Sequence, residues 1–106
     1  MKDKKDFKEI APGVFRRITH LDNLLVAVID FTGGPMKEPD LYHSHVHEQI
    51  TYVASGRLKF IIEGNEYLLK EGDTINIPSG MKHTIQTLIP EVRLVDSFSP
   101  IREDFL

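Results

Sequence analysis

Hydrophobic residues along the chain fall into short runs that are separated by turn-forming residues. The runs recur at intervals of about 8 to 12 residues and none has the period of an amphipathic helix, a pattern typical of a β-sandwich or β-barrel. Strands are therefore expected at residues 14–18, 24–31, 41–45, 49–55, 57–63, 66–69, 74–77, 83–87 and 92–98.

The run 57–63 shows the alternation most clearly. Leu58, Phe60 and Ile62 share one face and charged residues share the other, which predicts an antiparallel strand with one buried side. Gly64 and Asn65 follow directly, and glycine at the first central position is what a type II′ hairpin turn requires. All six prolines lie between the expected strands, where a missing N–H breaks no ladder.

Composition limits the class of protein. The chain has 106 residues, 41% apolar and 27% charged, which fits a single globular domain over residues 1–106. The formal net charge is −3 and the basic residues are scattered, so no nucleic-acid partner is expected. Because the chain has no cysteine, disulfides and thiolate metal sites are excluded, and a metal would need His, carboxylate or amide ligands.

The first ten residues are polar and contain no signal-peptide core. No apolar run elsewhere approaches the roughly 18 residues that a membrane-spanning helix needs. We therefore expect a cytoplasmic protein without a membrane partner, and disorder over residues 1–6.

Polar residues crowd one place in the pattern, around His43, His45 and Gln49. Alternate residues of a strand point the same way, so the two imidazoles can converge on one ion and Gln49 can join them after a turn. An isolated His-x-His is more often a solvated patch than a metal site. The residues around His43 and His45 are therefore needed to distinguish a metal site from a solvated patch.

Two spaced motifs contain these residues. The first is His43-x-His45-x-x-x-Gln49 followed after six residues by Gly56, and the second is Gly72, five residues, then Pro78-x-Gly80-x-x-His83. Their order and spacing resemble the two motifs of the cupin family, with Gln in place of the usual Glu, over residues 24–98. The resemblance implies an all-β, double-stranded β-helix (jelly-roll) barrel with one divalent metal ion on His43, His45, Gln49 and His83.

The spacing also separates these ligands from the neighbouring His47 and Glu48. If the motif began at His45, the fourth ligand position would fall on Thr51 and the motif glycine would be lost. His47 and Glu48 are therefore expected to support the ligands or form the turn.

The expected ligand set is uncharged. Three neutral imidazoles and an amide leave the double positive charge of the ion uncompensated, which favours anionic ligands and Lewis-acid chemistry. Imidazole and oxygen ligands suit Zn, Ni, Fe, Mn or Co, and the sequence does not choose among these metals.

A carboxylate lies among apolar neighbours near the end of the chain. Asp96 shares a predicted strand face with Val92, Leu94 and Phe98, and a buried Asp needs a partner. Arg102 could fold back to pair with Asp96 and anchor the C-terminal tail, residues 96–106. Alternatively, Asp96 could face the metal site and serve in acid–base chemistry.

A closer resemblance favours the second reading. Residues 43–50 and 98–105 resemble the KdgF group of pectin-degradation cupins, which convert 4,5-unsaturated uronate monomers from pectin or alginate into linear ketouronates. The resemblance implies the same reaction here, with Asp96 and Arg102 as catalytic groups, Phe98 and Arg102 binding the uronate, and assembly as a homodimer. The chain departs from the group at Val46, usually Pro, and in a longer loop over residues 32–40, which bears on the choice of uronate.

The sequence is also compatible with two other functions. One is a non-catalytic cupin that binds a sugar or a metal, since the barrel serves many purposes. The other is an Fe(II)-type dioxygenase, which also needs open metal positions but leaves Asp96 and Arg102 unexplained.

Overall fold

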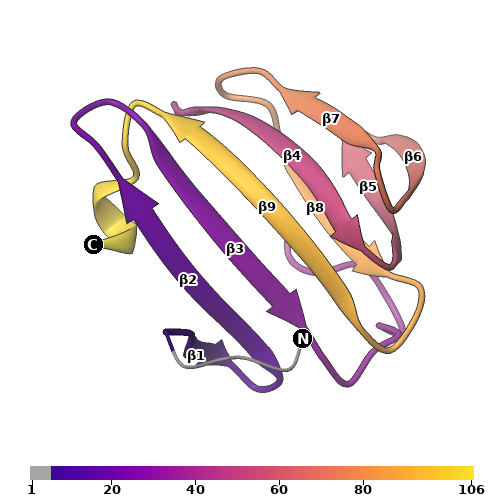
Figure 1. The fold of residues 1–106 in the computed structure, drawn as a ribbon. Helices are drawn as coiled ribbons and strands as arrows, with labels where there is room; N and C mark the ends of the chain where they lie inside the picture. The colour runs from indigo at the N-terminus through magenta and orange to yellow at the C-terminus, as the bar shows by residue number, and fades with distance from the viewer. Residues whose placement is uncertain (1–5) are drawn as a thin grey trace.

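The structure, a computed structural model, describes residues 6–106 and consists of two facing β-sheets (Figure 1). One sheet has six strands in the order β1-β2-β3-β9-β4-β7, and the other has three in the order β6-β5-β8. The strands are β1 Lys8–Ala11, β2 Val14–His20, β3 Leu25–Phe31, β4 Glu48–Ser55, β5 Arg57–Ile62, β6 Asn65–Lys70, β7 Thr74–Ile77, β8 His83–Thr87 and β9 Val92–Ser99. The all-β prediction is thus confirmed.

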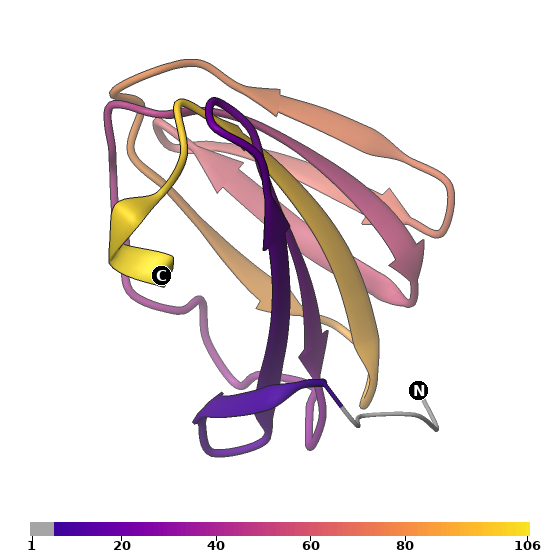
Figure 2. The same cartoon turned by 60° about the vertical axis from the view of Figure 1, so that its left-hand side comes forward.

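The core fills the space between the sheets, and the six-stranded sheet curves over the smaller one (Figure 2). The predicted inward face of β5 is confirmed, because Leu58, Phe60 and Ile62 are all buried. They pack with Val53, Ile77, Val92 and Leu94 in the main apolar cluster. A second, smaller cluster contains Leu25, Ala27 and Phe98 and receives Phe105 from the C-terminal end of the chain.

Strand β9 lies between β3 and β4 and sets the position of Asp96. Its inward residues Val92, Leu94, Asp96 and Phe98 are buried in strict alternation, as predicted. In the register with β4, Asp96 lies opposite Thr51 and Phe98 lies opposite Gln49. The register therefore brings a carboxyl group next to one of the expected metal ligands.

The strand expected at residues 41–45 is wrong. This segment forms only an isolated bridge, between His43 and His83, and Leu41 and Tyr42 are exposed. Apolar residues without a buried face do not hold a strand in a sheet. Residues 32–40 form the predicted loop, which lies along the free edge of β8. Two backbone hydrogen bonds hold it there, from Met36 N–H to Thr87 O at 3.1 Å and from Asp40 N–H to Ile85 O at 2.9 Å.

The predicted hairpin between β5 and β6 is present, but its turn type is wrong. Ile62 pairs with Asn65, so the central residues are Glu63 and Gly64, with φ of 48° and 83°. Positive φ at both central positions defines a type I′ turn, which matches the right-handed twist of the strands.

One motif glycine has a clear structural cause. Gly56 has a φ of 94°, and a Cβ atom there would lie 2.7 Å from Glu91 O and 2.8 Å from Val92 Cγ2. Only glycine fits this close turn between β4 and β5.

Two short elements were not predicted from the sequence, strand β1 and a 3₁₀-helix, η1, at Glu103–Phe105. Within residues 6–106, no helix is long and apolar enough to cross a membrane. The disorder expected for residues 1–6 concerns, apart from Asp6, residues outside the described range.

Candidate functional site

The bridge between His43 and His83 is the base of the candidate site. His43 N–H donates to His83 O at 3.0 Å, and His83 N–H donates to His43 O at 2.9 Å. This exchange brings the two ring centroids to 4.5 Å, and the His45 ring lies 5.0 Å from that of His83. Three imidazoles, two from the segment His43–His45 and one from the start of β8, therefore gather at one point of the sandwich.

Backbone carbonyls fix the tautomers of two of these rings. His45 Nδ1 lies 3.0 Å from His47 O, and His83 Nδ1 lies 3.0 Å from Met81 O. A carbonyl oxygen only accepts, so each Nδ1 carries the proton and each Nε2 has a free lone pair. Metal-binding histidines are oriented in this way. His47 thus contributes its carbonyl, in agreement with its predicted supporting role.

Gln49, at the start of β4, faces this group. Its Oε1 lies 3.1 Å from His45 Nε2, and both atoms are acceptors in the tautomer just described. Two acceptors at this separation repel each other unless a proton or a cation lies between them. The same separation suits two adjacent ligands that each lie about 2.1 Å from one ion.

The donor set therefore fits a metal ion. His83 Nε2 is buried and has no hydrogen-bond partner, and such an orphaned atom requires an explanation. In the arrangement described for residues 6–106, no three His, Asp or Glu side chains already form an ion site. A metal site here would use the Gln49 amide as a ligand in addition to the imidazoles. The rings would have to shift slightly to bind one ion, and His43 is the most exposed of the three residues.

All three imidazoles are held in the form that binds metals. Burial is the largest cause that lowers the pKa of His43, His45 and His83, and the positive charge of Arg102 lowers each further. Neutral rings at neutral pH leave Nε2 available as a ligand.

Asp96 is the buried carboxyl group of the site. Its side chain is 7% exposed, and burial raises its pKa to about 6, against the opposing effect of hydrogen bonds from Thr51 and Gln49. Its partner is the Thr51 hydroxyl, which donates to Asp96 Oδ1 at 2.6 Å. A direct Asp96–Arg102 pair was one of the two expectations for the tail, and the structure gives Arg102 another partner.

That partner is Asp104, on the 3₁₀-helix. Arg102 Nε and Nη2 donate to the two Asp104 oxygens at 3.0 and 2.6 Å, a bidentate pair. The guanidinium also lies over two aromatic rings, 5.2 Å from the centroid of Phe98 and 4.3 Å from that of Phe105. The tail is thus anchored around Arg102, although by aromatic stacking and Asp104 rather than by Asp96.

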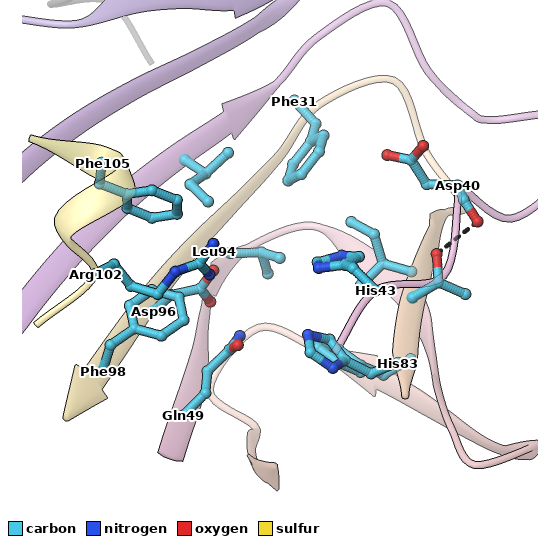
Figure 3. A pocket seen from close by; sticks show the side chains of 14 residues that line it. Phe31, Asp40, His43, Gln49, His83, Leu94, Asp96, Phe98, Arg102 and Phe105 are labelled. Atoms are coloured by element: carbon cyan, nitrogen blue, oxygen red, sulfur yellow. Dashed lines mark hydrogen bonds between the residues drawn. The ribbon is translucent and has the colours of Figure 1, made fainter. Parts of the chain in front are cut away.

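These groups line one pocket between the sheets (Figure 3). It extends from Arg102 and Phe105 on the C-terminal segment to Asp40 at the end of the 32–40 loop, with the imidazoles of His43 and His83 between them. The full lining is Ile29, Phe31, Asp40, His43, Gln49, Phe60, His83, Thr84, Ile85, Leu94, Asp96, Phe98, Arg102 and Phe105. His45 lies beside this lining, against Gln49 and Phe98.

Sequence reasoning missed three residues of the site, Thr51, Asp104 and Phe105. A signal existed for Thr51, because it lies two residues after Gln49 and therefore on the same strand face. No local pattern indicated the other two, since the chain reverses into the 3₁₀-helix only through tertiary packing of Phe105 on Phe98, with ring centroids 5.6 Å apart.

Known proteins resemble this chain in sequence and in structure. The family model described as cupin domain matches residues 28–92. The pectin degradation protein KdgF of Dickeya dadantii is 36% identical over 98% of this chain and 94% of that protein. Among solved structures, KdgF from Halomonas sp. has a TM-score of 0.88 at 30% identity, covering 100% of this chain and 96% of that one. An RmlC-like cupin from Shewanella frigidimarina has a TM-score of 0.86 at 27% identity, covering 100% and 93%.

Proposed function

The chain belongs to the cupin family, and on that premise we propose that it converts 4,5-unsaturated uronate monomers into linear ketouronates. The observation that carries the proposal is the content of one pocket: a buried carboxyl group, Asp96, and a guanidinium group, Arg102, beside the imidazoles of His43 and His83. The likeness to proteins named for pectin degradation supports the choice of substrate.

The ligands of the proposed metal ion are His43, His45, Gln49 and His83. When bound, a divalent ion supplies positive charge and Lewis acidity that stabilise an anionic substrate oxygen. The support for this set is the buried, unpartnered Nε2 of His83 and the two acceptors that face each other at 3.1 Å.

Asp96 is proposed to move the protons. The substrate is a cyclic enol ether, and its hydration adds a proton to C4 and a hydroxyl group to C5. Asp96 delivers the proton to C4 and takes one back from the water that adds to C5, so it is regenerated. The product is a hemiketal, which opens spontaneously to the ketone. A carboxyl group with a pKa of about 6 suits both transfers near neutral pH.

Arg102 and Phe98 are proposed to hold the substrate. A guanidinium binds a carboxylate through two parallel hydrogen bonds, which also fixes its orientation. The Phe98 ring is buried beside Arg102 and offers an apolar surface to the sugar ring.

The test follows the loss of the substrate double bond by ultraviolet absorbance. Purified protein is incubated with unsaturated galacturonate or mannuronate monomer, alongside Asp96→Asn and a sample treated with a chelator. We expect the rate to fall by at least about 100-fold in the variant, the usual contribution of a general acid–base group. Chelation should also stop turnover, and added Zn²⁺, Ni²⁺ or Mn²⁺ should restore it.

The matched control is Asp30→Asn, which removes another buried carboxylate. Asp30 is fully buried and pairs with Arg93 at 2.6 Å, outside the pocket lining. This variant should melt at a lower temperature and still turn over the substrate when folded. Equal rates for wild type, Asp96→Asn and the chelated sample would rule out the mechanism.

We further propose that the enzyme acts in the cytoplasm as a homodimer. Ile50 and Tyr52 on β4 are exposed by 53 and 44%, and Leu24, which directly precedes β3, is exposed by 47%. Leu24 and Ile50 line one hollow of the surface, and a second copy would cover these residues.

A further inference from the structure

We propose that Thr51 is a positioning residue that orients the metal ligand Gln49 and connects it to Asp96. The inference rests on the metal site of the proposed function. It assigns a role to a residue that is not one of the specified positions of either motif and that does not line the pocket.

The Thr51 hydroxyl group has a single proton to donate. Thr51 Oγ1 donates its single proton to Asp96 Oδ1 at 2.6 Å, the short distance of a hydrogen bond to an ionised carboxylate. The same oxygen must therefore be the acceptor in its second bond, with Gln49 Nε2 at 2.9 Å. Only the NH₂ group of the amide can donate, so it must face Thr51.

The orientation of the amide follows from this bond. With its nitrogen on Thr51, Gln49 presents Oε1 to the imidazole of His45 at 3.1 Å, where an ion would bind. The reversed amide would present NH₂ groups to a cation, and an amide nitrogen has no lone pair to donate to a metal. Thr51, together with Asp96 as a second acceptor for the amide NH₂ group, thus favours the orientation in which Gln49 can be a ligand.

Burial strengthens the preference of the Gln49 amide for this orientation. Thr51 is 0% exposed, Gln49 6% and Asp96 7%, so water cannot replace a missing partner. Leaving a buried polar group without a hydrogen-bond partner destabilises the folded protein. The strands fix the geometry, because Thr51 lies directly opposite Asp96 in the β4–β9 register.

The two hydrogen bonds of Thr51 also explain why position 49 carries an amide. A glutamate there would present a second acceptor to Thr51, which has only one proton to give. Gln49 and Thr51 therefore fit each other as a pair.

The experiment compares Thr51→Val, which keeps the shape and removes the hydroxyl, with Thr51→Ser, which restores the hydroxyl. The control is Thr87→Val, another buried threonine, 1% exposed. The Thr87 hydroxyl accepts a hydrogen bond from Met36 N–H. In Thr87→Val this N–H group still has a second acceptor, the backbone oxygen Thr87 O. The affinity of each folded protein for Zn²⁺ is measured by competition with a chelating dye, and its melting temperature is measured without metal.

We expect Thr51→Val to weaken Zn²⁺ binding by about 10- to 100-fold, the usual effect of losing a residue that orients a ligand. Thr51→Ser should stay within about threefold of wild type, and Thr87→Val should lower the melting temperature without changing the affinity. Wild-type affinity in Thr51→Val would overturn the inference. So would an equal loss of affinity in Thr87→Val, because the effect would then follow from stability alone.

The affinity measurement does not depend on turnover of a uronate. A protein that binds Zn²⁺ through Thr51 but leaves the unsaturated monomer unchanged would contradict the proposed reaction and keep this inference. A protein that turns over the monomer with unchanged metal affinity in Thr51→Val would do the reverse.

Discussion

At the scale of single residues, Asp96 shows how far the fold changes an ordinary side chain. An exposed aspartate is ionised at all physiological pH values. Here burial raises the pKa to about 6, while the Thr51 hydroxyl and Arg102 favour the charged form. The opposing effects keep the carboxyl group near the point where it can both give and take a proton.

The first prediction concerns the stability of the metal-free protein. Because folding raises the pKa of Asp96, protonation of this group stabilises the folded state below a pH of about 4, and this contribution is lost as the pH rises through about 6. Its size is on the order of 2 to 3 kcal/mol. We therefore expect the free energy of unfolding, measured with urea between pH 4 and pH 8, to differ between wild type and Asp96→Asn by an amount that changes over this interval. A constant difference would contradict the prediction.

The second prediction concerns the imidazoles. Burial lowers the pKa of His43, His45 and His83, so these rings stay neutral to a lower pH than free histidine, whose pKa is about 6.5. Metal binding releases protons only where the ligands are protonated. The Zn²⁺ affinity should thus be nearly constant from pH 8 down to about 6.5, the pKa of free histidine, and fall only at lower pH. Isothermal titration calorimetry over this range measures it, and a steep fall already between pH 8 and pH 7 would argue against these ligands.

At the scale of elements, the C-terminal segment carries more of the site than its length suggests. The 3₁₀-helix Glu103–Phe105 places Asp104 on the guanidinium of Arg102 and packs Phe105 beside Phe98. Arg16 on β2 also lies over the Phe105 ring, 4.0 Å from its centroid. Arg102 is therefore held in place before any substrate binds.

The third prediction follows from this pair. Asp104 occupies Nε and Nη2 of Arg102, one of the donor pairs through which a guanidinium can bind a carboxylate. Asp104→Asn removes the charge that competes with the substrate and should lower KM for the uronate about threefold to tenfold, with a smaller change in kcat. Glu103→Gln, which removes a neighbouring exposed charge, is the control. A higher KM in Asp104→Asn would instead indicate that Asp104 holds Arg102 in its active position.

At the scale of the whole molecule, two sheets enclose the pocket and leave apolar residues on the outside of the larger sheet. Ile50 and Tyr52 alternate with the buried residues Thr51 and Val53 on β4, so they point away from the core. Exposed apolar residues grouped on one sheet face are typical of an interface between subunits.

The fourth prediction tests this face as the interface of a homodimer. Light scattering coupled to size-exclusion chromatography should give the mass of a dimer for wild type and of a monomer for Ile50→Glu. Leu68→Glu is the matched control, because Leu68 is 73% exposed on the opposite, three-stranded sheet and should leave the dimer intact. A monomeric wild type at micromolar concentration would contradict the prediction.

Local patterns in the sequence determined the buried faces of several strands and the position of several pocket residues. Alternation identified the buried faces of β5 and β9, since a strand turns its side chains to opposite sides whatever the rest of the fold does. The spacing of the two histidine motifs placed His43, Gln49 and His83 in one pocket. Alternation failed at residues 41–45, where apolar side chains have no sheet to cover them.

Only the tertiary structure decided which groups interact. The partners of Asp96 and Arg102 depend on the register of β9 against β4 and on the fold of the last residues, and neither is encoded by neighbours in sequence. The sequence determined the candidate ligands and the buried carboxyl group of the site, because ligand spacing and strand alternation are local properties. Their hydrogen-bond directions, tautomers and pKa values depend on contacts between distant segments and on burial, so these emerged only from the folded chain.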